Sequence, residues 1–183
     1  MPDATQPSAA DVGEQIKADH RRVESLFSQI QAGSVNSPEL VRTAITELVK
    51  HSEAEELIVY PVLGTEVGKD VQEHAVDEHG QAEEVMAKLE KLSPGDADYD
   101  KLVTQLIDDI TKHVQEEEST VLPRLRSAIG DQRMAELGPA FMQAKEKAPT
   151  HPHPHAPDTP PGNVVAGPLA AIVDKVKDKL TGG

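Results

Sequence analysis

The sequence of 183 residues contains no cysteine and no tryptophan, and only two phenylalanines and two tyrosines. The absence of cysteine excludes disulfides, thiolate-bound zinc, iron–sulfur clusters and a cysteine nucleophile. The shortage of aromatic rings argues against a base-stacking platform for nucleic acid. No apolar run approaches the ~20 residues of a transmembrane helix, and residues 1–10 lack the pattern of a secretory signal. We therefore expect a soluble, cytoplasmic protein.

Positive charge is also scarce. The chain has 18 lysines and arginines against 32 aspartates and glutamates, which gives a formal net charge of −14. A negative excess of this size repels the phosphates of nucleic acids and the surface of an anionic membrane. The charge balance therefore predicts no nucleic-acid partner.

Proline divides the chain into parts. Half of the 14 prolines fall between Pro149 and Pro168. We expect an N-terminal tail over residues 1–9, a folded domain over 10–147 and a flexible Pro/His-rich linker over 148–168. The histidines of this linker indicate a spacer, with loose capture of a transition metal as the alternative. Residues 169–181 have the pattern of a short amphipathic helix, which we expect to dock on a protein partner in preference to the folded domain or a lipid surface.

Apolar residues recur every three or four positions in the folded part, and no stretch alternates with period two. The chain is therefore predicted to be all-α, and its short loops favour an up-down-up-down four-helix bundle. Pro61 and Pro123 are expected to stop or kink the second and fourth helices. Asp70, with Glu73 three residues later, predicts the cap of the third helix. A further helix is expected over 131–147, broken at Gly138-Pro139.

Each of the four apolar stripes is interrupted by histidine. Two of the interruptions are His-x3-Glu pairs, and a spacing of four places both side chains on one face of a helix. Carboxylates buried among imidazoles need a compensating cation, and a metal ion supplies that charge. The candidate ligands are His20, His51, Glu55, His79, His113 and Glu117.

The arrangement occurs twice. His51-x3-Glu55-Glu56-x4-Pro61 matches His113-x3-Glu117-Glu118-x4-Pro123, and Asp19-His20 matches Glu78-His79. Each half is a predicted helical hairpin, and two hairpins about an approximate two-fold axis would bring two equivalent half-sites together. The repeat thus predicts two metal ions, bridged by the two glutamates.

The ligand types limit the metal. Imidazole and carboxylate without thiolate suit iron, manganese or zinc, and zinc prefers four ligands, fewer than this site offers. For two six-coordinate ions joined by an oxo or hydroxo bridge, about two positions stay open, for a fifth protein ligand and an outside molecule. Iron with an open position can bind dioxygen, nitric oxide or peroxide.

These motifs resemble those of the hemerythrin-like, or HHE cation-binding, family over about residues 10–127. The resemblance implies a four-helix bundle with a non-heme di-iron centre, in which the four histidines are terminal ligands and Glu55 and Glu117 bridge. Oxygen-carrying members have His-x3-His in the third helix, whereas this chain has Ala75 before His79 and Glu83 after it. His74 and Glu83 are the alternatives for a fifth ligand.

The predicted function is the binding of dioxygen, nitric oxide or peroxide at the iron pair, for sensing, buffering or storage. A catalase-like enzyme that disproportionates peroxide and an iron-sensing interaction protein are the alternatives. Tyr60 is expected to end its helix, with proton or electron donation as the second interpretation. Other acidic residues near the motifs are predicted to be solvated or to accept hydrogen bonds from the ligand imidazoles; they are Glu24, Glu56, Glu83, Glu84, Glu116 and Glu118.

Overall fold

The computed structural model describes residues 11–33 and 37–154. The predicted N-terminal tail, most of the predicted linker and the predicted helix over 169–181 lie outside this range. The described chain is helical, without a strand. Its helices are α1 (Val12–Gln31), α2 (Ser37–Ala54), α3 (Tyr60–Glu66), α4 (Lys69–Leu89), α5 (Tyr99–Glu116) and α6 (Leu122–Lys147), with π-helical turns η1 (Glu55–Val59) and η2 (Glu117–Val121).

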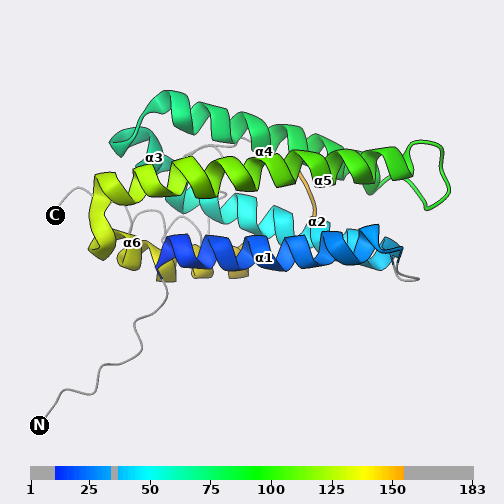
Figure 1. Ribbon diagram of the computed structural model, residues 1–183, viewed down its shortest axis with the longest axis horizontal. Coiled ribbons are helices and arrows are strands. Elements are labelled where there is room, and N and C mark those ends of the chain that lie inside the picture. The colour runs from blue at the N-terminus through cyan, green and yellow to red at the C-terminus, as the bar shows by residue number, and fades with distance from the viewer. Residues whose placement is uncertain (1–10, 34–36, 155–183) are drawn as a thin grey trace, which may run out of the picture.

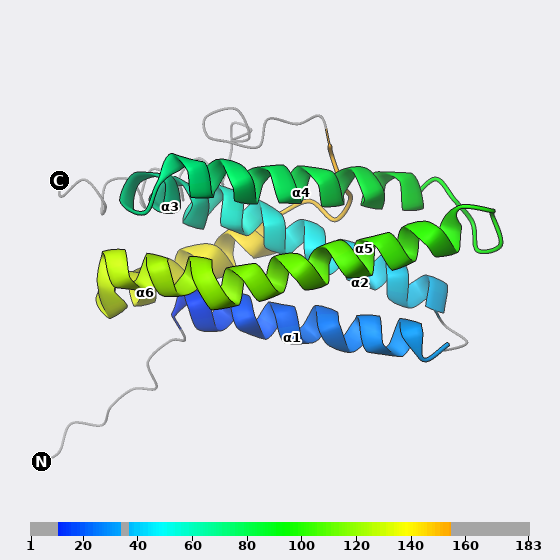
Figure 2. The ribbon, with the colours of Figure 1, turned by 45° about the horizontal axis from the view of Figure 1, so that its top comes forward.

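The four long helices α1, α2, α4 and α5 form an up-down-up-down bundle, which confirms the predicted fold (Figures 1 and 2). In this bundle α1 packs against α2, and α4 packs against α5. The chain then folds back, so that α6 lies against α1 and α2. No helix of the described segments is both long and apolar enough to cross a membrane.

Two apolar clusters fill the interior, one toward each end of the bundle. The first contains Ile16, Ile58, Leu125 and Phe141, and the second contains Phe27, Leu48, Met86 and Ile110. Between them lies a layer of buried polar side chains, which we call the polar layer. Each of the four rods of the bundle, meaning a long helix together with any π-helical turn that follows it, contributes one or two of these side chains. This layer consists of His20, His51, Glu55, His79, His113 and Glu117. The stripes predicted from the sequence are thus apolar at both ends and polar in the middle.

Of the stop or kink predicted at the prolines of the second and fourth helices, the stop does not occur. Both rods continue past the proline, because a π-helical turn precedes it. The N–H of Tyr60 donates to the carbonyl of Glu55, and the N–H of Leu122 donates to the carbonyl of Glu117. Each turn therefore holds one extra residue. The wider turn relieves the clash and the missing donor that proline would impose on an α-helix.

Two helix boundaries also differ from the prediction. Asp70 does not cap α4, because the helix begins one residue earlier and its N-cap is Gly68, at φ 155°. The last helix is broken at Gly130, with φ 77° and ψ 165°, so a helical segment begins near Asp131 as predicted, but it continues through Pro139 and the predicted break at Gly138-Pro139 was wrong. Only glycine adopts such a backbone conformation without strain, so the chain turns at Gly130. By contrast, Asp11 caps α1 by accepting a hydrogen bond from the N–H of Glu14 at 3.1 Å.

Residues 148–154 lie against the bundle after α6 ends. The hydroxyl of Thr46 donates to the carbonyl of Thr150 at 3.4 Å, and Nδ1 of His151 lies 2.7 Å from Oε1 of Glu90. Pro152 is buried. The first part of the predicted linker therefore packs on α2 and α4.

Candidate metal centre

The six side chains predicted as ligands converge in the polar layer, and each is at most 6 % exposed. They form two groups, and within each group one nitrogen or oxygen per residue lies within 4.8 Å of the others. One group is His20, His51 and Glu117, and the other is Glu55, His79 and His113. The imidazole pairs are matched as well, with ring centroids 5.0 Å apart for His20 and His51 and 4.8 Å apart for His79 and His113.

Both glutamates reach across the two groups. Oε2 of Glu55 lies 3.4 Å from Nε2 of His51 and 3.5 Å from Nε2 of His79. Oε2 of Glu117 lies 3.2 Å from Nε2 of His20 and 3.8 Å from Nε2 of His113. Neighbouring ligands of one ion with bonds of 2.0–2.2 Å are roughly 3.0–3.6 Å apart. Three of the four distances fall in this range and the fourth, 3.8 Å, lies just beyond it, so the spacing suits two ions with the carboxylates between them.

A second layer of carboxylates holds the outer side of each imidazole. Nδ1 of His51 lies 3.3 Å from Asp19, and Nδ1 of His113 lies 2.9 Å from Glu78. Asp19 directly precedes His20 in α1, and Glu78 directly precedes His79 in α4. The two pairs are therefore equivalent in the repeat.

The other two imidazoles follow the same rule. Nδ1 of His20 lies 2.8 Å from Glu118, and Nδ1 of His79 lies 3.1 Å from Glu56. Here each acceptor directly follows a glutamate that is a candidate bridge. An acceptor at Nδ1 fixes the tautomer and directs Nε2 inward, as second-layer carboxylates do for metal-bound histidine.

Several inward atoms make no hydrogen bond to any described residue. They are Nε2 of His20, Nε2 of His51, Oε1 of Glu55 and Oε2 of Glu117. Nε2 of His20 lies 3.2 Å from Oε2 of Glu117, and Nε2 of His51 lies 3.4 Å from Oε2 of Glu55, but the angles at these atoms are not those of hydrogen bonds. Buried polar atoms without partners cost about 1–3 kcal/mol each. A cation held by each group would satisfy them, so the residues present fit a metal pair.

Without metal, protons on the imidazoles supply part of the positive charge that the buried carboxylates need. Burial alone would lower the pKa of His51, but the Glu55 carboxylate and Asp19 raise it to about 10. Burial also acts against a proton on His113, yet its hydrogen bond to Glu78 and the charge of Glu117 raise its pKa. Burial and the charges of His113 and His51 hold the pKa of His79 well below its usual value. A bound metal ion would displace these protons.

Tyr60 lies inside the layer and breaks its symmetry. Its hydroxyl is 2.9 Å from Nε2 of His79, and it donates to Oε2 of Glu55 at 3.3 Å. Burial and the charge of Glu55 raise the phenol pKa well above its usual value, so the proton stays on oxygen. The equivalent position in the second half of the repeat is Leu122, which packs in the apolar core. The second group thus has the Tyr60 hydroxyl beside it, and the equivalent position beside the first group carries no hydroxyl.

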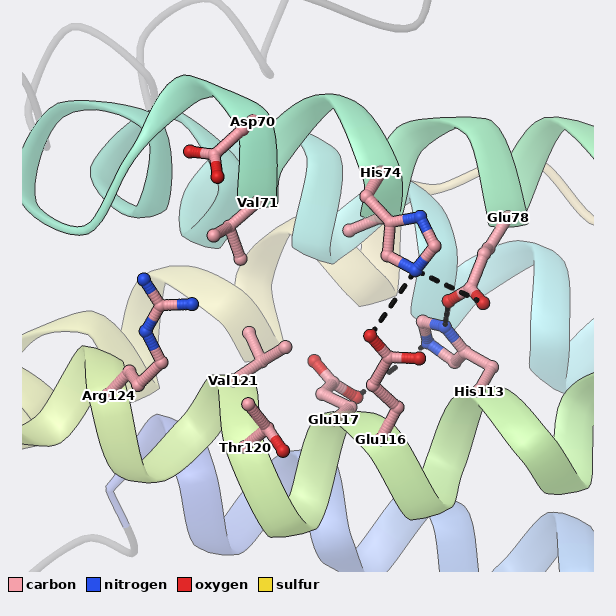
Figure 3. A pocket seen from close by; sticks show the side chains of 11 residues that line it. Asp70, Val71, His74, Glu78, His113, Glu116, Glu117, Thr120, Val121 and Arg124 are labelled. Carbon is pink, nitrogen blue, oxygen red and sulfur yellow. Dashed lines mark hydrogen bonds and ion pairs between the residues drawn. The ribbon is translucent and has the colours of Figure 1, made fainter.

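The two alternatives for a fifth ligand lie elsewhere. Glu83 accepts a hydrogen bond from the backbone N–H of His153 at 3.4 Å. His74 is half exposed and contacts Glu78 and Glu116. His74, Glu78 and Glu116 stand at one side of a cavity of about 210 Å³ (Figure 3). The wall of this cavity also includes His113 and Glu117.

Sequence reasoning missed some functional positions. Glu56 and Glu118 were among the predicted acceptors, but Asp19 and Glu78 were used only as repeat markers. Their place directly before His20 and His79 in both halves was a usable signal. The contact of Tyr60 with the layer depends on the π-helical turn, which no local pattern in the sequence indicates.

Comparison with known proteins agrees with this geometry. The chain is 30% identical to an uncharacterized hemerythrin-like protein of Schizosaccharomyces pombe over 175 residues, which are 92% of this chain and 86% of that protein. It is also 27% identical over 136 residues to a DNA nickase of Nostoc, spanning 72% of this chain but only 38% of the nickase. No solved structure matches the chain significantly.

The family comparison covers the whole bundle core. The Hemerythrin HHE cation binding domain matches residues 11–125, more than half of the chain and all six converging side chains. Two histidine and glutamate groups that could hold a metal ion lie within the matched residues. The protein belongs to the hemerythrin HHE cation-binding domain family.

Proposed function

We propose that the polar layer binds two iron ions and that the iron pair takes up a small ligand, either dioxygen, nitric oxide or peroxide. The observation that carries this proposal is the pair of carboxylates, Glu55 and Glu117, each within 3.8 Å of an imidazole nitrogen from both groups. Such an arrangement favours two bridged ions over a single ion. A ligand set of imidazoles and carboxylates without thiolate suits iron.

The proposed ions would be held by His20 and His51 on one side and by His79 and His113 on the other, with Glu55 and Glu117 between them. Iron bound there would supply an open coordination position and reversible electron transfer. The cavity beside Glu117 and His113 offers a small molecule access from the surface. We therefore favour sensing, buffering or storage of a small ligand by a cytoplasmic protein that binds no nucleic acid.

One observation favours a catalase-like enzyme as the second candidate. The Tyr60 hydroxyl is buried within hydrogen-bond distance of both Glu55 and His79. A phenol that keeps its proton can donate a hydrogen bond, or the proton itself, to a substrate oxygen at the second group. Oxygen release from added peroxide tests this candidate. We expect negligible turnover, and turnover that His113→Ala abolishes would instead establish the enzyme.

Metal analysis with an absorption spectrum tests the main proposal. Protein purified from iron-replete cells should contain about two irons per chain and show a near-ultraviolet charge-transfer band that changes on reduction and on exposure to air. Glu55→Ala should lose metal, because it removes a bridge and leaves cationic charge uncompensated. Its melting temperature should fall by about 5–10 °C with that loss.

Glu84→Ala is a matched control, because Glu84 is an exposed α4 residue that pairs with Lys88. It should keep the metal and the melting temperature. Zinc as the sole bound metal in iron-replete cells, or equal iron content in Glu55→Ala and the unaltered protein, would contradict the proposal.

A further inference from the structure

A third group of metal-ligand side chains lies outside the polar layer, between α4 and α5. It consists of His74, Glu78 and Glu116, with one ligand atom from each within 4.8 Å of the others. Nε2 of His74 lies 3.5 Å from Oε1 of Glu78 and 3.3 Å from Oε1 of Glu116. Figure 3 shows the three side chains pointing toward one another from the two helices. We call this group the outer cluster.

The geometry of the outer cluster suits a metal ion as well as a set of ion pairs. Both nitrogen–oxygen distances fall within the roughly 3.0–3.6 Å that separate neighbouring ligands of one ion with bonds of 2.0–2.2 Å. His74 and Glu116 are half exposed and Glu78 is 16 % exposed, so an ion could arrive from solvent and keep water ligands. One imidazole with two carboxylates suits a divalent transition-metal ion.

The cavity supplies an independent observation, because it joins the outer cluster to the buried centre. Its wall includes the outer cluster together with His113 and Glu117. Glu117 is 2 % exposed, and its Oε2 has no hydrogen-bond partner among the described residues. Asp70 and Arg124 stand at the other end of the cavity (Figure 3). The negative charge of Asp70, Glu78 and Glu116 exceeds the positive charge of Arg124, and this excess favours cations in the cavity.

One carboxylate belongs to both sites. Oε1 of Glu78 faces His74, and its Oε2 accepts from Nδ1 of His113 at 2.9 Å. An ion on the outer cluster would therefore be one carboxylate and one imidazole away from the second group of the buried centre.

The first half of the repeat has no such cluster. The positions equivalent to His74 and Glu116 are Gln15 and Ala54. The equivalent of Glu78 is Asp19, whose Oδ1 pairs with Lys145, whereas Oε1 of Glu78 faces His74. Glu78 also has an ammonium neighbour, Lys112 at 3.5 Å from Oε1, but Lys112 is 72 % exposed and is free to turn into solvent. Lys145 is only 15 % exposed, so its ammonium group is held beside Asp19 and would repel a cation there. The expected number of outer ions is therefore one, although the buried centre has two half-sites.

We propose that His74, Glu78 and Glu116 form a third, single site for a divalent transition-metal ion, from which metal enters the buried centre through the cavity. The entry role rests on the proposed buried centre, whereas binding at the outer cluster does not.

Metal counting tests the binding. After equilibrium dialysis of the full chain against Zn²⁺, the unaltered protein should hold one more ion than either His74→Ala or Glu116→Gln. The matched control is Glu73→Gln, an exposed neighbour on α4 outside the cluster, which should bind as many ions as the unaltered protein. Ions held by the histidines at 151–155 would raise all counts equally and leave the difference unchanged. Equal counts in all four proteins would overturn the proposal.

Glu55→Ala separates this inference from the proposed function. It should lose the buried ions and keep the ion that depends on His74. Stopped-flow mixing of metal-free protein with Co²⁺ then tests the entry role. His74→Ala and Glu116→Gln should fill the buried centre about tenfold more slowly than the unaltered protein and Glu73→Gln, to the same final absorbance. Equal rates in all four proteins would overturn the entry role.

Discussion

Each histidine of the polar layer has two differently placed nitrogens. Nδ1 lies near a carboxylate at the edge of the layer, and Nε2 points to the middle of it. An imidazole so held loses little freedom when a metal binds, and its tautomer is already correct. The acceptors therefore contribute to metal affinity although they would not touch the ion.

Glu118 offers a clean test of this contribution. Its carboxylate lies 2.8 Å from Nδ1 of His20 and also pairs with Arg21, which is mostly exposed. Glu118→Ala should weaken metal binding about 10–100-fold, because His20 loses the group that orients it. Glu118→Gln keeps a carbonyl acceptor and should lose less. Competition with a chelator of known affinity measures both variants.

Glu24→Gln is the control for Glu118. Glu24 also pairs with Arg21, at 3.2 Å, but the substitution leaves the acceptor of His20 in place. Its metal affinity should match that of the unaltered protein. If Glu118→Ala binds metal equally tightly, the orienting role of the acceptor is wrong.

At the scale of the helices, the two π-helical turns and the break at Gly130 determine what surrounds the polar layer. Each π turn begins at a glutamate of the polar layer and ends two residues before a proline. The break at Gly130 sends the rest of α6 back along α1 and α2. As a result, the Phe141 ring lies 6.1 Å from that of His51, and Lys145 pairs with Asp19. The last helix therefore covers one side of the polar layer.

Substitution of two glycines should change stability in opposite directions. An added Cβ at Gly130 meets no described atom within 4 Å, so the backbone conformation alone decides the effect. Gly130→Ala should cost about 1–3 kcal/mol, which lowers the melting temperature by roughly 2–10 °C. Gly80→Ala, inside α4 and equally open, should stabilise the protein by about 0.5–1 kcal/mol. Thermal unfolding of the metal-free proteins measures both effects, and a stabilised Gly130→Ala would contradict the assigned break.

The sequence predicted the bundle and the six converging side chains because periodic stripes and a matched repeat are local, countable signals. It could not predict the π turns, since Pro61 and Pro123 look like helix ends when hydrogen bonding to residues five positions back is not considered. It placed the break of the last helix at Gly138-Pro139 because a glycine in a helical pattern does not indicate its φ. The outer cluster joins two helices, and the sequence offered His74 only as an alternative fifth ligand of the buried pair.

The whole molecule places a charged layer between two apolar clusters, and contacts between its first and last helices hold that layer closed. Arg126 of α6 donates to Oδ2 of Asp11, the cap of α1, at 2.8 Å. Arg126 also pairs with Asp131 at 2.5 Å. Asp11 therefore links α1 to α6 at one end of the bundle as well as capping a helix.

The stability contributed by Asp11 should depend on pH in a defined direction. Partial burial tends to raise the pKa of this carboxyl, but Arg126 and the N–H groups of Glu14 and Gly13 together lower it below its usual 3.8. A carboxyl with a lowered pKa in the folded state stabilises the protein above its unfolded pKa, and this contribution is lost as the pH falls through the lowered value. Asn caps a helix as well as Asp, so Asp11→Asn removes only the charged part.

Urea unfolding of the metal-free protein measures the contribution of the Asp11 charge separately from its capping role. Metal-free protein is needed because acid would otherwise release bound metal and change the stability on its own. At about pH 7, Asp11→Asn should be less stable than the unaltered protein by roughly 0.5–1 kcal/mol, and the difference should shrink toward zero below about pH 3. Asp131→Asn shares the Arg126 partner from a side chain that is 85 % exposed, and it should change stability little at any pH because water screens that pair. A difference between Asp11→Asn and the unaltered protein that stays constant down to about pH 3 would mean that the contact acts through shape alone, without its charge.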